Sequence, residues 1–506
     1  MVTGSGRLGG GADRISGLPD DLLHGILLGL GCTKAAARTS VLSRRWRGVW
    51  ARLPEFYLWG LRPVFPASCV TIVDGALAAC AAPTLRRLVI RVGDVNLPLK
   101  GVTAAHAAPW LRFASGCVAG ELFLWLPMDI LPTWRQEQDL DLPVCAATRS
   151  IQIRLRRNFR LRPPLSGGGA FAALTCLGIY DGVMDGVELG TLVSSSLCPC
   201  LEDLSLTVRL ASNFDVCICS DSLKRLSFRV ENTRSLVVAA PVLLEICVSK
   251  TREAHIAAPK LADVELIDDM DPGAGPLGIQ GNFEYPNSKS WARPCMDHCE
   301  IDEAGRHLQR LVVNLRFPLA GILQRFGTIK ELIIDRLVIQ SGTEGYNTFL
   351  KDLRRLDCES LVTQSMWTCH GFAPIMLRLL RICNGLRKFV VALSGREGSF
   401  GCASDCPCTW PESCRNDNFV LDSLEEIEIN GFTGKDHQLE CLNLLLGCNA
   451  PLLKKVVFRL SCIDFFECTD IIREKIRGKL PLDIELSACL KHRKPFGILD
   501  ELDLYT

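Results

Sequence analysis

A short apolar unit recurs along most of the chain, and it restricts the fold more than any other feature. Each unit has leucine or isoleucine, two residues, an apolar residue, one residue, and another apolar residue. Leu201, Leu223, Leu243 and Leu261 open four successive units, at spacings of 22, 20 and 18 residues. The units are Leu85-Leu88-Ile90, Leu174-Leu177-Ile179, Leu201-Leu204-Leu206, Leu223-Leu226-Phe228, Leu243-Ile246-Val248, Leu261-Val264-Leu266, Leu308-Leu311-Val313, Ile329-Leu332-Ile334, Leu386-Phe389-Val391, Leu424-Ile427-Ile429 and Leu453-Val456-Phe458. A period of this kind indicates one repeated supersecondary element.

The alternation within each unit predicts a short strand that buries one face. One such strand cannot bury its face alone, so stacked neighbours are expected to form a parallel sheet over a common core. Proline stands two residues before several units, at Pro199, Pro241, Pro259 and Pro451. Proline suits a turn before a strand but not a central strand. The period lies at or just below the range of leucine-rich repeats. An ordinary α/β domain with leucine-rich strands is the alternative.

The N-terminal segment has a different pattern. Leu22, Leu23, Ile26, Leu27 and Leu30 recur at helical spacing, and two further short helices fit before residue 53. Three helices of this size share too small a core to be stable alone. The segment is therefore predicted to gain burial from a partner surface.

This segment resembles an F-box of the plant type, although a small helical hairpin with a tryptophan core is the alternative. The family motif usually has Leu-Pro at the end of the first helix, where this chain has Leu30-Gly31-Cys32. The matching residues are Asp13, Arg14, Ile15, Ser16, Leu18, Pro19, Asp20, Arg38, Thr39, Ser40, Leu42, Ser43, Arg44, Arg45, Trp46 and Trp50. The resemblance implies that the segment binds a Skp-family adaptor. The candidate contact or framework residues, whose two roles the sequence does not separate, are Leu18, Pro19, Leu22, Ile26, Leu42 and Trp46.

The C-terminal part resembles the FBD region that follows the repeats in such proteins. Its pattern predicts a strand, a glycine turn, an amphipathic helix and a strand, which would suit the end of an array. The matching residues are Leu424, Glu425, Ile427, Glu428, Ile429, Gly431, Phe432, Gly434, Glu440, Leu444, Leu445, Ala450, Leu453, Lys454, Lys455 and Val456. A plain last repeat is the alternative.

The predicted fold class is α/β: a three-helix F-box, an irregular leucine-rich-repeat solenoid and an FBD-like cap. The expected boundaries, in order, are a flexible tail over 1–12, an F-box over 13–53, a connector over 54–84, repeats over 85–420, an FBD-like region over 421–490 and a tail over 491–506. Within the repeats, glycine-rich and polar composition predicts loops near 268–305 and 395–418.

Composition excludes several function classes. A formal net charge of +1 gives no overall electrostatic reason to bind nucleic acid or an anionic membrane. No uninterrupted apolar run reaches the roughly 18 residues of a membrane-spanning helix. The first 12 residues have no apolar core that a signal peptide could use. The 25 scattered cysteines indicate a reduced protein of the nucleus or cytoplasm.

Metal and catalytic sites are not expected. The four cysteines from Cys402 to Cys414 have enough thiolates for zinc but lack the usual paired spacings, so a surface loop with free thiols is predicted. Cys295, His298 and Cys299 supply only three ligands. No pattern of nucleophile and base stands out, so the chain is predicted to be no enzyme and to need no cofactor.

The resemblances together imply a substrate-recruiting adaptor of an SCF-type cullin-RING ubiquitin ligase, whose repeat surface holds a protein of unknown identity. The alternatives are a leucine-rich-repeat scaffold or ligand receptor without ligase activity and a zinc-dependent enzyme.

Overall fold

The computed structural model describes residues 18–61, 66–92, 102–126, 137–164, 170–266, 298–302, 307–314, 326, 328–335, 355–367, 372–394, 420–432, 442–443, 445, 447–461 and 483–489. The chain divides into two compact units, Met1–Lys260 with His298–Ala304 and Leu261–Asp297 with Gly305–Thr506. Both units consist mainly of parallel strands, which confirms the predicted strand-rich α/β class. Among the described helices, none is long and apolar enough to cross a membrane.

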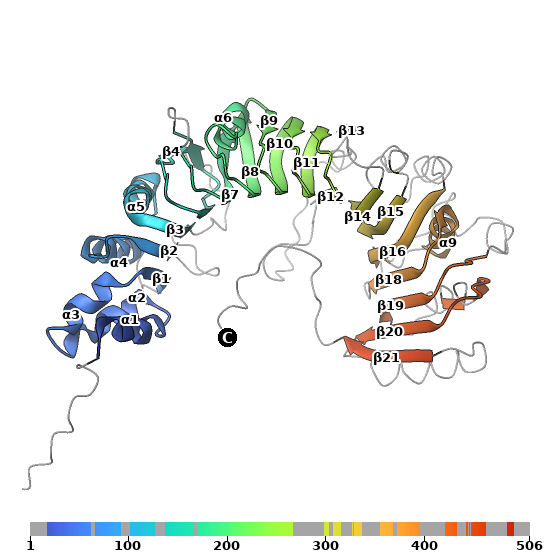
Figure 1. The fold of residues 1–506 in the computed structure, drawn as a ribbon, viewed down its shortest axis with the longest axis horizontal. Helices are drawn as coiled ribbons and strands as arrows, with labels where there is room; N and C mark the ends of the chain where they lie inside the picture. Colours follow the sequence, from blue (N-terminus) through green and yellow to red (C-terminus); the bar gives the residue numbers. More distant parts are fainter. Residues whose placement is uncertain are drawn as a thin grey trace, which may run out of the picture. The chain divides into compact units, whose positions relative to one another are not determined.

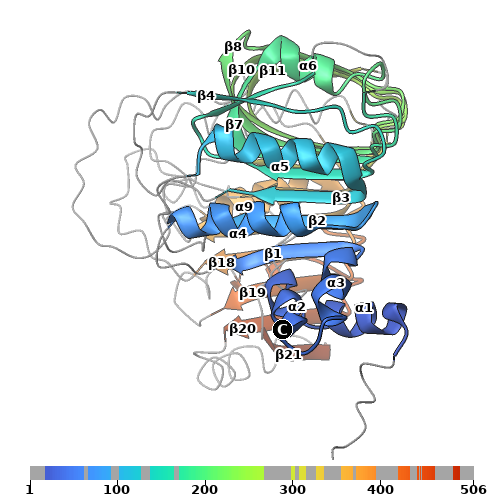
Figure 2. The ribbon, with the colours of Figure 1, turned by 90° about the vertical axis from the view of Figure 1, so that its left-hand side faces the viewer.

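The first unit begins with short helices and continues as a parallel ladder (Figure 1). The N-terminal helices are α1 (Asp20–Leu28), α2 (Thr33–Arg38), η1 (Thr39–Val41), α3 (Trp46–Val49) and η2 (Trp50–Arg52). The first ladder contains, in spatial order, β1 (Glu55–Leu61), β2 (Leu85–Val92), β3 (Val118–Trp125), β5 (Ser150–Arg154), β7 (Cys176–Asp185), β8 (Asp203–Ser212), β10 (Arg225–Ala239) and β11 (Glu245–Ala257). The helices α4 (Pro66–Ala79), α5 (Ala104–Cys117) and α6 (Gly186–Leu192) lie on the outer side of these strands (Figures 1 and 2).

A second set of strands begins after a sharp bend of the backbone, which we call a corner. It contains β4 (Gln138–Asp141), β6 (Phe159–Arg162), β9 (Asp215–Cys219), the second halves of β10 and β11, and β13 (His298–Asp302). At the corners, Asp181, Asn213, Asn232 and Lys250 adopt positive φ angles of 59°, 49°, 67° and 61°. Asparagine and aspartate tolerate this left-handed conformation better than most residues, and they supply three of these four corners.

The second unit continues the parallel pattern. Its strands are β12 (Asp263–Leu266), β14 (His307–Asn314), β15 (Thr328–Asp335), β16 (Leu356–Trp367), β18 (Lys388–Ser394), β19 (Glu426–Phe432), β20 (Lys455–Ser461) and β21 (Asp483–Cys489). The helix α9 (Phe372–Ile382) leads into the two-residue strand β17 (Cys383–Asn384), which pairs with the start of β16.

The core is formed by the residues that the repeat pattern selects. All of them except Leu453 are at most 3% exposed. The predicted turns are also present, because the N–H of Leu243 donates to Ala240 O at 3.1 Å and that of Leu453 to Ala450 O at 3.1 Å. Pro241 and Pro451 therefore take the second position of a turn, where the fixed φ of proline is favourable.

Strand starts in neighbouring coils are joined in a regular way, where a coil is one repeat from its turn to the next. The N–H groups of Lys224 and Arg225 both donate to Glu202 O at 2.9 Å. Those of Leu244 and Glu245 donate to Lys224 O, at 2.9 and 3.2 Å. Each coil thus places its first strand by hydrogen bonds to the coil before it.

Two predicted boundaries need correction. The segment 54–84, expected as a connector, contains β1 and α4, and β1 pairs with β2, so the strand array begins before residue 85. The loop expected near 268–305 contains β13, where Cys299 and Ile301 are buried at alternate positions beside β11. β1 has the same leucine unit, Leu53-Phe56-Leu58, which the sequence prediction missed, and its three side chains are at most 1% exposed. β13 has no leucine or isoleucine at the position that opens a unit. The loop expected near 395–418 lies outside the described residues.

One ion pair in the second unit predicts a dependence of stability on pH. Glu428 Oε1 accepts a hydrogen bond from Arg459 Nε at 2.6 Å, and Lys388 Nζ lies 3.5 Å from Oε2. Burial alone would raise the pKa of Glu428, but the hydrogen bond and charge of Arg459 and the charge of Lys388 lower it overall. This contribution is therefore present above the unfolded pKa of about 4.3 and is lost as pH falls through the folded value.

We expect Glu428→Gln to reduce the urea-unfolding free energy of the full chain at pH 7, and the difference from wild type to shrink below about pH 4. The exposed turn carboxylate of Asp422 provides the control, because Asp422→Asn is expected to change little at either pH. A constant difference between wild type and Glu428→Gln from pH 7 to pH 3 would contradict the prediction.

Candidate protein-binding surfaces

The helix α1 is apolar on two sides. Leu23 and Leu27 are buried, at 0% and 1% exposure, and they face the interior of the first unit. Leu22 and Ile26 lie on the other side of the helix and are 56% and 48% exposed. A surface helix normally has one apolar stripe and one polar face. The second apolar side of α1 thus has no partner among the described residues.

The exposed apolar side chains continue beyond α1. Leu30 follows Ile26 by one helical turn and is 47% exposed, whereas Val41 and Leu42 in and after η1 are 86% and 65% exposed. We call Leu22, Ile26, Leu30, Val41 and Leu42 the apolar patch. Several exposed apolar side chains within one short segment commonly mark a protein-binding site.

The structure separates the residues predicted from the sequence by their exposure. Pro19, directly before α1, is exposed, as are Leu22, Ile26 and Leu42, whereas Leu18 is half-buried. Trp46 is 4% exposed and belongs to the core. Sequence reasoning missed Leu30 and Val41 as contact candidates. Their signals were present, because Leu30 lies four residues after Ile26 and Val41 adjoins Leu42.

A charged contact joins the start of α1 to the residue before α3. Arg45 Nη2 donates to Asp20 Oδ1 and to Leu18 O, both at 2.6 Å. The hydrogen bond from Arg45 lowers the pKa of Asp20. This contact fixes the beginning of α1 relative to the segment that follows Leu42.

The N-terminal helices also depend on β1. The backbone N–H of Tyr57 donates to Thr33 Oγ1 at 2.7 Å, and Trp59 Nε1 donates to Gly31 O at 2.8 Å. The side chain of Thr33 is buried. The helices and the first strand of the sheet therefore form one packed body.

Thr33→Val keeps the shape of the side chain but removes the acceptor for the Tyr57 N–H. Leaving a partly buried donor unpaired costs about 1–3 kcal/mol. We expect amide hydrogen exchange in β1 of the full chain to become about 10-fold faster. Ser115→Ala, which removes only a hydrogen bond to Arg112 O one turn earlier in α5, is the control. Unchanged exchange in β1 would show that Thr33 does not hold this strand.

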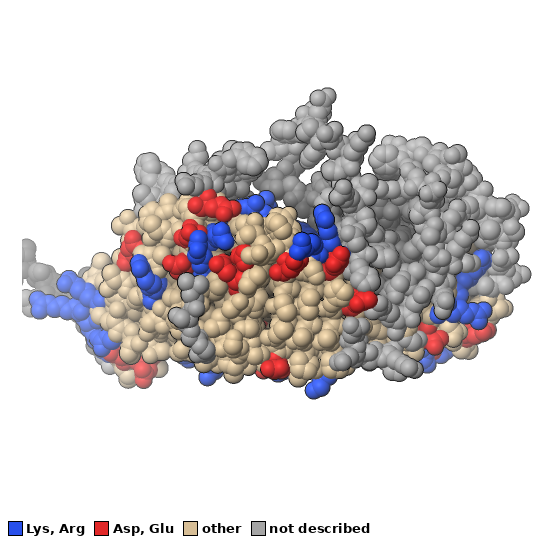
Figure 3. Space-filling view, turned by 90° about the horizontal axis from the view of Figure 1, so that it is seen from above, with Lys and Arg blue, Asp and Glu red and all other residues tan. Residues whose placement is uncertain are grey.

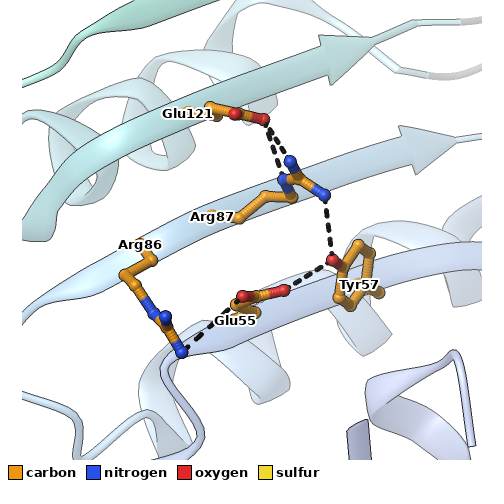
Figure 4. Close-up of polar contacts among 5 residues, drawn as sticks. All are labelled: Glu55, Tyr57, Arg86, Arg87 and Glu121. Atoms are coloured by element: carbon orange, nitrogen blue, oxygen red, sulfur yellow. Dashed lines mark hydrogen bonds and ion pairs between the residues drawn. The ribbon is translucent and has the colours of Figure 1, made fainter. Parts of the chain in front are cut away.

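The exposed face of the first three strands carries a paired polar network (Figure 4). Arg87 Nε donates to Glu121 Oε2 at 2.8 Å, and Arg87 Nη1 donates to the hydroxyl of Tyr57 at 3.3 Å. The Tyr57 hydroxyl donates in turn to Glu55 Oε2 at 2.6 Å. Burial and the hydrogen bond to Glu55 raise the pKa of Tyr57 to about 12. Charges in this row are thus compensated within the chain.

A groove of about 500 Å³ lies where β9, β10 and β11 end. Its lining consists of serine, alanine and proline side chains together with Cys219 and Asp221. Among the described residues that line it there is no histidine, lysine or second carboxylate. It therefore offers no acid–base pair of the kind used in catalysis.

Metal ligands do not gather in the part of the chain that the structure describes. No group of three or more histidine, cysteine, aspartate or glutamate side chains is placed to hold a metal ion there. His298 and Cys299 lie on β13, and Cys299 is buried. Cys295 and the cysteines from Cys402 to Cys414 lie outside the described residues.

Comparison with known proteins supplies the family. An F-box/FBD/LRR-repeat protein of Arabidopsis thaliana is 43% identical over 450 residues, which cover 87% of this chain and 88% of the relative. The chain belongs to the plant F-box/FBD/LRR-repeat family. A second F-box/FBD/LRR-repeat protein of the same plant is 31% identical over 245 residues, covering 46% of this chain and 50% of the relative. An F-box protein is 28% identical over 369 residues, covering 68% and 82%.

No protein-family profile matches the chain. The similarity to an F-box/FBD/LRR-repeat protein over most of both chains nevertheless confirms the resemblance that the two ends of the sequence predicted. In this F-box/FBD/LRR-repeat protein, the apolar patch lies within the segment that resembles the F-box, and the parallel strands contain the predicted leucine units.

Proposed function

We propose that this protein is a substrate-recruiting subunit of an SCF-type cullin-RING ubiquitin ligase. The helices α1 to α3 form the F-box, the parallel strands form the leucine-rich repeats, and β19 and β20 belong to the FBD region. The apolar patch carries the proposal, because its five side chains are 47–86% exposed on a helical segment that resembles an F-box. A Skp-family adaptor would cover them.

The division of roles follows from this arrangement. The N-terminal helices bind the adaptor, while the exposed face of the strands binds the substrate protein. The chemistry of ubiquitin transfer belongs to other subunits of the ligase. This chain accelerates transfer by holding the substrate close to the reacting groups, which raises their effective concentration.

Co-purification with a Skp-family adaptor tests the proposal. We expect the full chain to form a stable complex with the adaptor, and a chain lacking residues 1–60 to form none. Affinity purification from plant cells, with proteasome and neddylation inhibited, should then recover adaptor and cullin together with a substrate. If the full chain captures no adaptor, a repeat scaffold or receptor without ligase activity becomes the better explanation.

A further inference from the structure

Four neighbouring strands of the first ladder place arginine and aromatic residues side by side. Arg91 on β2 is paired in register with Trp125 on β3, Trp125 with Arg154 on β5, and Arg154 with Tyr180 on β7. All four side chains are partly exposed, whereas the residues directly before them, such as Ile90 and Leu124, are buried. We call these four residues the arginine–aromatic row.

The guanidinium groups stack on the rings between them. The Cζ atoms of Arg91 and Arg154 lie 5.2 and 5.6 Å from the centre of the Trp125 ring, and they come from strands on opposite sides of β3. The Cζ atom of Arg154 also lies 5.8 Å from the Tyr180 ring. These distances are typical of cation–π contacts, and stacking leaves the N–H edge of each guanidinium free to bind an anion.

The row has donors without matching acceptors. Within the described residues, Arg91 forms no ion pair, and Arg154 is paired with Asp181 alone, whose Oδ2 lies 3.7 Å from Nε, too far for a hydrogen bond. Trp125 Nε1 and Arg154 Nε are buried and make no hydrogen bond to the described chain. Arginine and tryptophan side chains only donate. Acceptors must therefore come from water or from a bound partner.

The row at the strand starts differs in this respect. There Arg87 lies 2.7 Å from Glu121, and Arg225 forms a close ion pair with Asp203. On β2 and β3, the same face thus carries Arg87, which is paired with Glu121, and, four residues further along, Arg91, which has no carboxylate partner among the described residues. Stability alone would favour pairing in both rows.

The aromatic end of the row is held in place before any partner arrives. A Cβ atom at Gly178 would lie 2.8 Å from the Tyr180 ring, so the ring lies directly across this glycine. The Tyr180 hydroxyl donates to Gln152 Oε1 at 3.3 Å. A ring fixed in this way loses little freedom when a ligand packs against it, which favours binding.

The chemistry of the partner follows from the spacing of the charges. Arg91 and Arg154 lie two strands apart, roughly 10 Å, with the Trp125 ring between them. The two guanidiniums cannot converge on one phosphate, as arginine clusters do, but each can bind its own carboxylate. On the face drawn in Figure 3, the described basic and acidic side chains lie next to one another in small groups among other residues, so this face has no continuous basic surface of the kind that binds nucleic acid.

We propose that the arginine–aromatic row binds an extended acidic segment of a partner protein. Two of its carboxylates bind Arg91 and Arg154, while an apolar side chain between them packs on Trp125 and another, beyond the carboxylate at Arg154, packs on Tyr180. An extended chain advances about 3.3 Å per residue and its side chains alternate between two faces, so carboxylates on one face that span roughly 10 Å are expected two or four residues apart. The inference rests on the proposed function in one respect, because the partner would be the ligase substrate.

Fluorescence anisotropy with the full chain tests this inference. The probes are labelled peptides of leucine and alanine that carry two glutamates separated by one to five positions. We expect the tightest binding when the second glutamate is two or four residues after the first, at least 10-fold weaker binding when both glutamates become glutamine, and weaker binding at high salt. The double variant Arg91→Gln/Arg154→Gln is expected to abolish the preference for glutamate.

Matched variants make the result specific. Arg112→Gln/Arg252→Gln removes two charges from exposed positions of the first unit outside the row, and its peptide affinity should stay within 2-fold of wild type. The inference is overturned if glutamate and glutamine peptides bind equally, if Arg91→Gln/Arg154→Gln binds like wild type, or if phosphoserine peptides or a single-stranded oligonucleotide bind more tightly. Adaptor capture is measured separately. If Arg91→Gln/Arg154→Gln still captures the adaptor, the variant is folded. If wild type captures no adaptor, the ligase role is refuted, but peptide binding by the row is not.

Discussion

Leu22→Glu/Ile26→Glu is expected to weaken capture of a Skp-family adaptor by the full chain by at least about 100-fold, or about 2.7 kcal/mol. Leu22 and Ile26 are about half exposed, so the carboxylates of glutamates at these two positions remain hydrated in the free chain. In a complex they would lie in an apolar contact without a partner, where burial of a charge is costly. Isothermal titration calorimetry with purified adaptor measures the change.

Two controls separate binding from folding. Leu244→Glu changes another exposed leucine, in the turn before β11, and should leave adaptor affinity unchanged. Trp46→Ala removes a buried side chain and should reduce the stability of the N-terminal helices by about 3–5 kcal/mol, which Leu22→Glu/Ile26→Glu should not do. Unchanged adaptor affinity in Leu22→Glu/Ile26→Glu would rule out the apolar patch as the contact surface.

Gly186→Val is expected to cause the largest loss of stability, about 3 kcal/mol or more. Gly186 begins α6, directly after the N-cap Asp185, whose side chain accepts from the N–H groups of Val187 and Glu188. A Cβ atom at Gly186 would lie 1.8 Å from Asn213 O and 2.6 Å from Asp215 O. These are backbone atoms of the corner before β9, so neither can move without disturbing the strand.

Urea unfolding followed by circular dichroism measures this effect, with soluble yield as a second readout. Gly75→Ala is the matched control, because Gly75 lies inside α4 and a Cβ atom there would meet nothing within 4 Å. Alanine favours a helix interior by about 0.5–1 kcal/mol relative to glycine, so this variant should be as stable as wild type or slightly more stable. Equal stability of Gly186→Val and wild type would mean that α6 does not pack closely on the corner.

The repeat positions could be predicted because leucine at a fixed spacing is a strong signal, but units with other residues were missed. In β5 the unit is Thr148-Ile151-Ile153, where the buried Thr148 hydroxyl donates to Val118 O at 2.7 Å. A threonine whose hydroxyl is hydrogen-bonded can replace the first leucine of a unit, and a search for apolar residues does not detect it. In β16 the equivalent residues are Cys358, Leu361 and Thr363, all buried. An apolar pattern that begins with leucine or isoleucine misses this unit as well.

The second set of strands was also not predicted, because it depends on the corners. A single Asn213, Asn232 or Lys250 carries no distinctive signal until its positive φ is known. At the N-terminal segment, sequence spacing identified apolar residues but not their surroundings. Trp46 and Leu42 match the same motif, yet one is buried and the other is 65% exposed, because only the packing of α3 against its neighbours separates them.

The paired hydrogen bonds at the strand starts have a consequence for how the chain is made. The backbone N–H groups of Lys224 and Arg225 donate to the carbonyl of Glu202, and those of Leu244 and Glu245 donate to that of Lys224, so the start of each coil is placed by residues already synthesised. Closing each contact needs a loop of only about 20 residues, which is fast on the time scale of translation. The first unit can thus assemble coil by coil as it leaves the ribosome, with each finished edge serving as the template for the next.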